Sequence, residues 1–255
     1  MKLLLAELKR SWTMLRRYGA ETIGGIVATT VVFYGLFLSA KYVAGEVQFG
    51  DRLDAIVVGY VLWSLVLFIV GDISGGLQQE AQTGTLEQLF LSPFGAPRIF
   101  VTRALAGLTT QLLINATILL IISLLTGTRL AFPIALMLPL VAVLLGAYGL
   151  ALAMGSLALL LKRVQQVLGV FNFGLLFVLT VPVESWAGSA KWLGMLLPMT
   201  PGAGMLRALM AQGRSLDGLQ LTIAFLNGAG YFAIGLSLFC WAEREVKRRG
   251  KLSGY

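Results

Sequence analysis

The side chains that could do chemistry in this sequence are carboxylates, amides and hydroxyls, because its 255 residues include no histidine and one cysteine. Zinc-type catalysis and histidine-dependent general base catalysis are therefore excluded, and no metal site is expected. Polar side chains gather in the stretch 75–95, GGLQQEAQTGTLEQLFLSPFG, between two strongly apolar regions. These side chains are suited to hydrogen bonding, so we expect this stretch to contact a partner.

A short helix is predicted inside this stretch. Thr85 followed by Gln88 fits a capping box, in which each side chain satisfies a free backbone N–H group. Gly84 breaks the preceding structure, and Pro93 disfavours helical backbone at Ser92. The helix then has about seven residues and a length of roughly 10 Å. Isolated helices this short are marginal in water, so another surface must stabilise it.

The same helix has an apolar face and polar contacts beside it. Leu86, Leu89 and Phe90 share one face at i, i+3 and i+4. Two interpretations are open from the physics: the helix docks as a knob into a groove on a soluble protein, or it lies flat under lipid. The candidate contact residues are Thr85, Leu86, Glu87, Gln88, Leu89, Phe90 and the upstream Glu80.

The elements that carry this helix are predicted from the composition. The chain is 57% hydrophobic and 13% charged, whereas soluble domains have about a quarter charged residues. A membrane span needs roughly 20 helical residues, and continuous apolar windows argue against barrel strands. We therefore predict an all-α polytopic membrane protein with six spans in one domain, 1–255. The charge-free windows are Thr22–Ala40, Ala55–Gly71, Ala104–Thr128, Leu130–Leu161, Val164–Val183 and Gly218–Ala242.

The distribution of basic residues predicts the orientation of these spans. If both termini are cytoplasmic, fourteen Lys and Arg residues lie inside and six outside, in agreement with the positive-inside rule. The net charge of +8 is then explained by orientation. Since no stacking aromatic residues accompany a basic face, nucleic acid is not expected as a partner. The predicted location is the plasma (inner) membrane.

Residues 1–20 and 184–218 are predicted to lie outside the six regular spans. The first segment reads as an amphipathic helix at the cytoplasmic interface, with a simple positive anchor as the alternative. In the second, Met205, Leu206, Leu209 and Met210 share a helical face. Prolines break this segment, which predicts two short helices re-entering the membrane from outside, or an amphipathic segment on the outer surface.

Four amides fall within the predicted spans: Gln111, Asn115, Asn172 and Asn227. They are candidates for lining a substrate path, and interhelical hydrogen bonding is the alternative for each. No acidic residue lies in the middle of a predicted span, which disfavours a proton-driven carrier. Small residues recur every four positions between Ala142 and Gly155, and they allow close helix contact within one chain or across a dimer.

Three stretches resemble one known family. Gly84-Thr85-Leu86-Glu87-Gln88-Leu89 followed by Ser92-Pro93 resembles the coupling segment of type-2 ABC exporter permeases, especially the drug and antibiotic resistance branch. LALAMGSLALLLKRVQQV, 150–167, resembles the end of that family's fourth helix and its basic turn. LLPMTPGAGMLRALM, 196–210, resembles its proline-containing re-entrant segment, with Pro198, Pro201 and Arg207 in order. Glu80 is displaced from the family's acidic position, and Gln82 occupies the nearer place.

The resemblance covers essentially the whole chain and implies a mechanism. It implies that two permease subunits, identical or related, pair around a central path and that two separate cytoplasmic ATP-binding subunits dock on the coupling segment 74–98. The sequence has no G-x-x-x-x-G-K-[ST] phosphate loop, so ATP and Mg are expected on the partner, and this chain is not itself an enzyme. The expected substrate is hydrophobic or amphipathic, such as a drug, an antibiotic or a lipid-like molecule. A non-transporting scaffold and a secondary carrier are the alternatives.

Overall fold

The fold of the described residues is helical. The computed structural model describes residues 2–44, 50–83, 96–128, 130–161, 165–182, 186 and 188–248. The longer helices are α1 (Lys2–Arg17), α2 (Gly19–Ala44), α3 (Gly50–Thr83), α5 (Ala96–Thr126), α6 (Met137–Leu161), α7 (Gln165–Thr180) and α10 (Gly218–Arg248). The shorter ones are the 3-10 helix η2 (Ile134–Leu136), α8 (Ser189–Leu196) and α9 (Thr200–Ala211).

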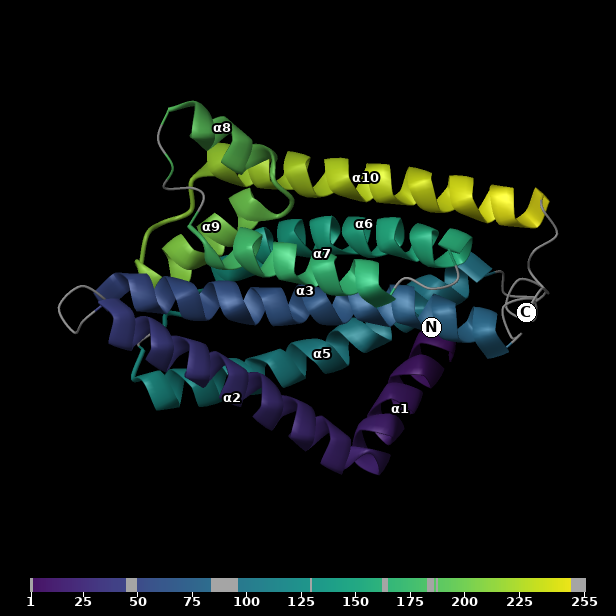
Figure 1. Ribbon diagram of the computed structural model, residues 1–255, viewed down its shortest axis with the longest axis horizontal. Coiled ribbons are helices and arrows are strands. Elements are labelled where there is room, and N and C mark those ends of the chain that lie inside the picture. Colours follow the sequence, from purple (N-terminus) through teal and green to yellow (C-terminus); the bar gives the residue numbers. More distant parts are fainter. Residues whose placement is uncertain are drawn as a thin grey trace.

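Helix α3 runs through the middle of the molecule. Figure 1 shows α6 and α7 on one side of it, with α10 beyond them, and α5 and α2 on the other side. Helix α3 contacts α5, α6, α7 and α9, and its residues Val66 and Val70 are fully buried with Val143 and Ala147 of α6. We call the end where α3 finishes and α5 starts the hairpin end; α8 and α9 lie at the opposite end (Figure 1).

Five helices in the described part of the chain are long and apolar enough to cross a membrane: α2, α3, α5, α6 and α10. Helix α7 is apolar but has 16 residues, which corresponds to about 24 Å of helix. The hydrocarbon core of a bilayer is about 30 Å thick. The prediction of an all-α polytopic protein is therefore confirmed, with five to six spans.

Helix α3 is longer than the sequence predicts. The charge-free window ends at Gly71, but the helix continues to Thr83 and so includes Asp72 and the first part of the polar stretch. Packing explains the extension, because Ser74 and Leu77 are buried. A Cβ built on Gly155 of α6 would lie 3.0 Å from Leu77 Cδ1. The packing of Leu77 on α6 outweighs the low helix propensity of Gly75 and Gly76, which precede it.

The small residues of α6 pack against α10. A Cβ at Gly235 of α10 would overlap the carbonyl oxygen of Gly149, and one at Gly228 would overlap that of Ala142. Glycine lets the two backbones approach this closely, as in other membrane helix pairs. The repeated small residues of α6 thus serve a contact within this chain.

Two short helices occupy the segment 184–218, as predicted. Met205, Leu206, Leu209 and Met210 of α9 are all buried, so the predicted apolar face is confirmed. Helix α9 packs against α3, α6 and α10. Whether these helices re-enter a membrane stays a prediction.

Helix α1 confirms that the N-terminal segment is helical. It leaves the bundle at an angle and meets α2 in a sharp bend (Figure 1), and it packs against α5. Leu8 and Leu15 are partly buried, whereas Leu5 and Trp12 are exposed. The Arg16 guanidinium lies 5.2 Å from the Trp12 ring centroid, which is within the range of a cation–π contact.

Candidate functional site

The predicted coupling residues follow the end of α3. Thr85 to Phe90 fall outside the described residues, so their short helix stays a prediction. Glu80 belongs to the last turn of α3. Because α3 ends at Thr83 and α5 begins at Ala96, the segment between them joins two long helices at the hairpin end.

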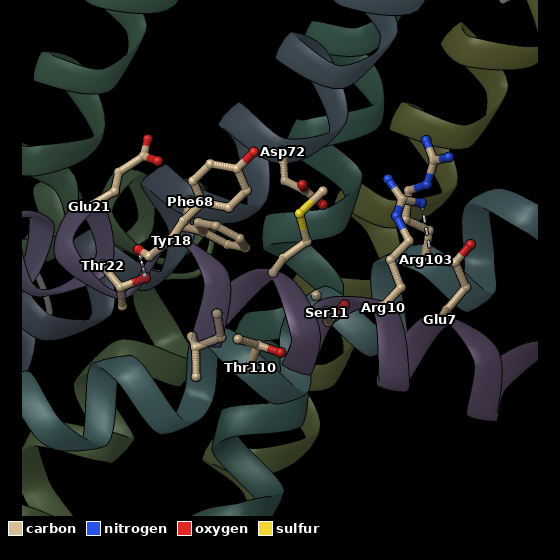
Figure 2. Close-up of a pocket in the computed structure, with 13 residues that line it drawn as sticks. Glu7, Arg10, Ser11, Tyr18, Glu21, Thr22, Phe68, Asp72, Arg103 and Thr110 are labelled. Carbon is tan, nitrogen blue, oxygen red and sulfur yellow. Dashed lines mark hydrogen bonds and ion pairs between the residues drawn. The ribbon is translucent and has the colours of Figure 1, made fainter.

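A cavity of about 300 Å³ lies among α1, α2, α3 and α5. Figure 2 shows Arg10, Arg103 and Glu7 at one end, and Glu21, Tyr18 and Phe68 at the other, with Asp72 between them. Its remaining lining consists of two apolar side chains, a glycine and three hydroxyl side chains: Met14, Leu15, Gly107, Ser11, Thr22 and Thr110. The cavity therefore combines charged groups with apolar and hydroxyl side chains.

The charged groups around Arg10 and Arg103 come from three helices. Arg10 Nη1 donates to Glu7 Oε2 at 3.3 Å within α1. Asp72 of α3 interacts electrostatically with Arg103 of α5 and with Arg10. Its Oδ2 would lie 3.5 Å from a Cβ built on Gly107, so the carboxylate faces α5. These groups link α1 to the α3–α5 pair.

The sequence did not predict this charged cluster. Asp72 lies one residue past the charge-free window Ala55–Gly71, and the sequence assigns Arg10 and Arg103 only to the predicted cytoplasmic positive charge. A carboxylate one residue beyond an apolar window can indicate such a cluster, because a helix that continues past the window packs the carboxylate against its neighbours. The i, i+3 spacing of Glu7 and Arg10 is a second signal.

Gln111 and Asn115 lie together on α5, and both are buried. Asn115 Nδ2 donates to the Gln111 carbonyl oxygen at 3.1 Å, and Ser64 Oγ of α3 donates to Asn115 Oδ1. Asn115 also lines an otherwise apolar cavity of about 180 Å³ among α3, α5, α6 and α9. Among the four amides, Asn115 therefore both forms a hydrogen bond between two helices and lines a cavity.

Asn172 lies on α7, away from the pair on α5. Its carbonyl oxygen accepts a hydrogen bond from Trp63 Nε1 of α3 at 3.0 Å. Its side-chain Oδ1 is buried and accepts no hydrogen bond from the residues that the structure describes. The two roles predicted for the Asn172 side chain, lining a substrate path or bonding another helix, therefore stay predictions.

Asn227 of α10 holds the turn between α8 and α9. Its Oδ1 accepts from the backbone N–H of Met199 at 3.0 Å, and its Nδ2 donates to the carbonyl oxygens of Met195 and Leu197 at 3.0 and 3.1 Å. Met199 has a positive φ of 64°, a conformation that costs free energy for a residue with a side chain. Asn227 stabilises that strained turn.

The predicted proline and arginine positions also lie at this end. Pro198 lies in the α8–α9 turn, and Pro201 occupies the first turn of α9, where its missing N–H group is not needed. Arg207 of α9 is 1% exposed. Its Nη1 donates to the Leu179 carbonyl oxygen of α7 at 2.6 Å, so it connects α9 to the last turn of α7.

The structure distributes the predicted site residues over separate places. Gln111 and Asn115 are neighbours; Asn172 and Asn227 have partners of their own on other helices. Among the described residues, no group of three or more His, Cys, Asp and Glu side chains is placed to hold a metal ion.

The helices define the class of the protein, a multi-pass helical membrane protein. A family model described as ABC-2 type transporter matches residues 2–211. This match covers well over half of the chain, so the protein belongs to the ABC-2 type transporter family as a transmembrane permease component. A comparison with curated proteins gave no match. The family resemblance predicted from the coupling motif is thus confirmed, and the drug-resistance branch stays a prediction.

Proposed function

We propose that the chain is the membrane-spanning permease of an ATP-driven exporter. The family match carries this proposal, and the arrangement of α3 and α5 supports it. These helices are joined at the hairpin end by the segment with the GTLEQL motif. A separate ATP-binding subunit docks there, and its closure on ATP moves both helices.

The ATPase contact is made by Thr85 to Phe90, with Glu80 beside them. Leu86, Leu89 and Phe90 enter an apolar groove of the partner, and the polar side chains align the helix. ATP and Mg are bound by the partner. Two ATPase copies act on two permeases, which are identical or related.

The hairpin end and both termini are cytoplasmic in this proposal, and α1 lies at the membrane interface of the plasma (inner) membrane. Exposed Leu5 and Trp12 on α1 support this placement, since amphipathic helices bury such side chains among lipid headgroups. The helices α8 and α9 then lie at the outer end.

The substrate is hydrophobic or amphipathic, and a drug, an antibiotic or a lipid-like molecule fits this description. The cavity beside Asn115 supports this class, because its other lining residues are apolar. Apolar walls with one well-placed polar group are typical of small-molecule sites. The resemblance to the resistance branch adds to the same proposal.

The test measures the ATPase activity of the partner subunit in liposomes that contain the full-length chain. Wild-type chain is expected to bind the ATPase and stimulate it, whereas Leu89→Asp inserts normally and loses most of the stimulation, because a carboxylate cannot enter an apolar groove.

Leu252→Asp, the same change in the basic C-terminal tail, is the matched control and should stimulate like wild type. If Leu89→Asp stimulates the ATPase fully, the docking proposal is wrong. If the wild-type chain inserts but neither binds nor stimulates any ATPase, a scaffold that recruits another cytosolic protein becomes the better explanation.

A further inference from the structure

The cavity among α1, α2, α3 and α5 has two ends of different chemistry. We call the end at Arg10 and Arg103 the arginine end, and the end at Glu21, Tyr18 and Phe68 the Glu21 end. Figure 2 shows these groups on opposite sides of the same space. A ligand that fills the cavity therefore meets guanidinium groups on one side and a carboxylate with aromatic rings on the other.

The arginine end is suited to a phosphate group. The side chain of Arg10 is 50% exposed, and Nη1 is the atom that bonds Glu7. A guanidinium has five N–H donors in a fork that matches phosphate oxygens. Glu7 and Asp72 offset the charge of the two arginines, so a phosphate there is held mainly by hydrogen bonds from the exposed guanidinium of Arg10.

The Glu21 end is suited to an ammonium group. Glu21 lies in the first turn of α2 and is exposed, and the aromatic residues Tyr18 and Phe68 line the same part of the cavity (Figure 2). A carboxylate attracts an ammonium by charge, and aromatic faces add a cation–π contribution. Among the described lining residues, this end has no basic side chain to compete.

The position of the cavity favours a lipid over a soluble ligand. Its volume of about 300 Å³ is at the small end of ligand sites. Ile23, Val27 and Val31 of α2 are exposed, and their i, i+4, i+8 spacing forms a stripe that leads away from the Glu21 end. A headgroup in the cavity would leave its acyl chains along this stripe.

We infer that the cavity binds the headgroup of a zwitterionic phospholipid, with the phosphate at the arginine end and the ammonium at the Glu21 end. The bound lipid joins α1 to α2, α3 and α5 near the hairpin end. This inference rests on the chain lying in a membrane and does not depend on docking of an ATPase, so either proposal can fail alone.

The experiment measures lipid binding to the purified full-length chain in detergent by native mass spectrometry. The probes are phosphatidylethanolamine and phosphatidylglycerol with identical acyl chains, and free O-phosphoethanolamine. We expect a stronger signal for phosphatidylethanolamine than for phosphatidylglycerol, and no displacement of either lipid by O-phosphoethanolamine at equal concentration. Equal binding of the two lipids overturns the zwitterion assignment, and displacement by O-phosphoethanolamine overturns the lipid as the source.

Three variants locate the binding. Glu21→Gln should lower phosphatidylethanolamine binding by about threefold, the range of one exposed ion pair, and leave phosphatidylglycerol unchanged. Ser11→Phe fills the cavity without a change of charge and should lower the binding of both lipids. Arg16→Gln removes a charge of α1 that does not line the cavity, and it should bind both lipids like wild type. If Glu21→Gln and Ser11→Phe also bind like wild type, the cavity is not the site.

Discussion

At the scale of single residues, Asn227 and Arg207 each bind specific backbone groups. Asn227 uses both ends of its amide on the α8–α9 turn, and Arg207 donates to the last turn of α7. In a helical membrane protein such groups have no water as an alternative partner. Their loss therefore leaves backbone groups unsatisfied in the interior.

Replacing Asn227 by leucine tests whether its hydrogen bonds stabilise the α8–α9 turn. The change removes three hydrogen bonds and leaves Met199, with its positive φ, without its acceptor. We expect the free energy of unfolding to fall by about 2 kcal/mol. The measurement is thermal unfolding of the purified chain in detergent, followed by tryptophan fluorescence.

Asn172→Leu is the matched control, because the side-chain oxygen of Asn172 accepts no hydrogen bond from the described residues. It should unfold close to wild type. Equal melting temperatures for the two variants would show that the Asn227 hydrogen bonds do not stabilise the turn.

Residue types predicted candidates but not their partners. The sequence places Asn115 and Asn227 within predicted spans, yet only the fold shows that Asn115 faces Ser64 and that Asn227 faces a turn 28 to 32 residues away along the chain. The arginines near Asp72 could not be predicted, because they come from two other helices, α1 and α5.

At the scale of elements, hydropathy predicts where helices are and tertiary contacts decide where they end. The windows correspond to α2, α3, α5, α6, α7 and α10 because each span must bury its backbone polar groups in a helix. Helix α3 extends to Thr83 because Leu77 packs on α6, which no local pattern reveals. The sequence likewise left open whether the small residues of α6 contact a helix of the same chain or of a second subunit.

The α6–α10 contact predicts a sharp difference between two glycines of α10. A Cβ at Gly235 overlaps the Gly149 carbonyl oxygen, whereas a Cβ at Gly230 meets nothing within 4 Å. Gly235→Ala forces the helices apart and should lower the free energy of unfolding by about 2 kcal/mol. Gly230→Ala, the control, should be neutral or slightly stabilising because alanine favours helix.

Unfolding of both variants in detergent measures this difference. A Gly235→Ala protein as stable as Gly230→Ala would mean that α6 and α10 can separate freely, and the close approach would then have no role in stability.

At the scale of the whole molecule, α3 connects the two ends. Its 34 residues correspond to about 50 Å of helix. It leads into the predicted coupling segment at the hairpin end, and it packs against α9 towards the other end. In the proposed function, a displacement of the segment is transmitted towards α9 along this one continuous helix.

The proposed orientation predicts opposite accessibility for these two ends. The single native cysteine, Cys240, allows a Cys240→Ser background in which one new cysteine reports each end. Trp192→Cys on α8, where the native side chain is 71% exposed, should react with a membrane-impermeant maleimide on intact cells. Ser92→Cys in the predicted coupling segment should react only after the membrane is permeabilised, because the positive-inside distribution predicts a cytoplasmic position for it. The reverse pattern would put the segment on the side without ATP, and no cytosolic ATPase could then drive the permease through it.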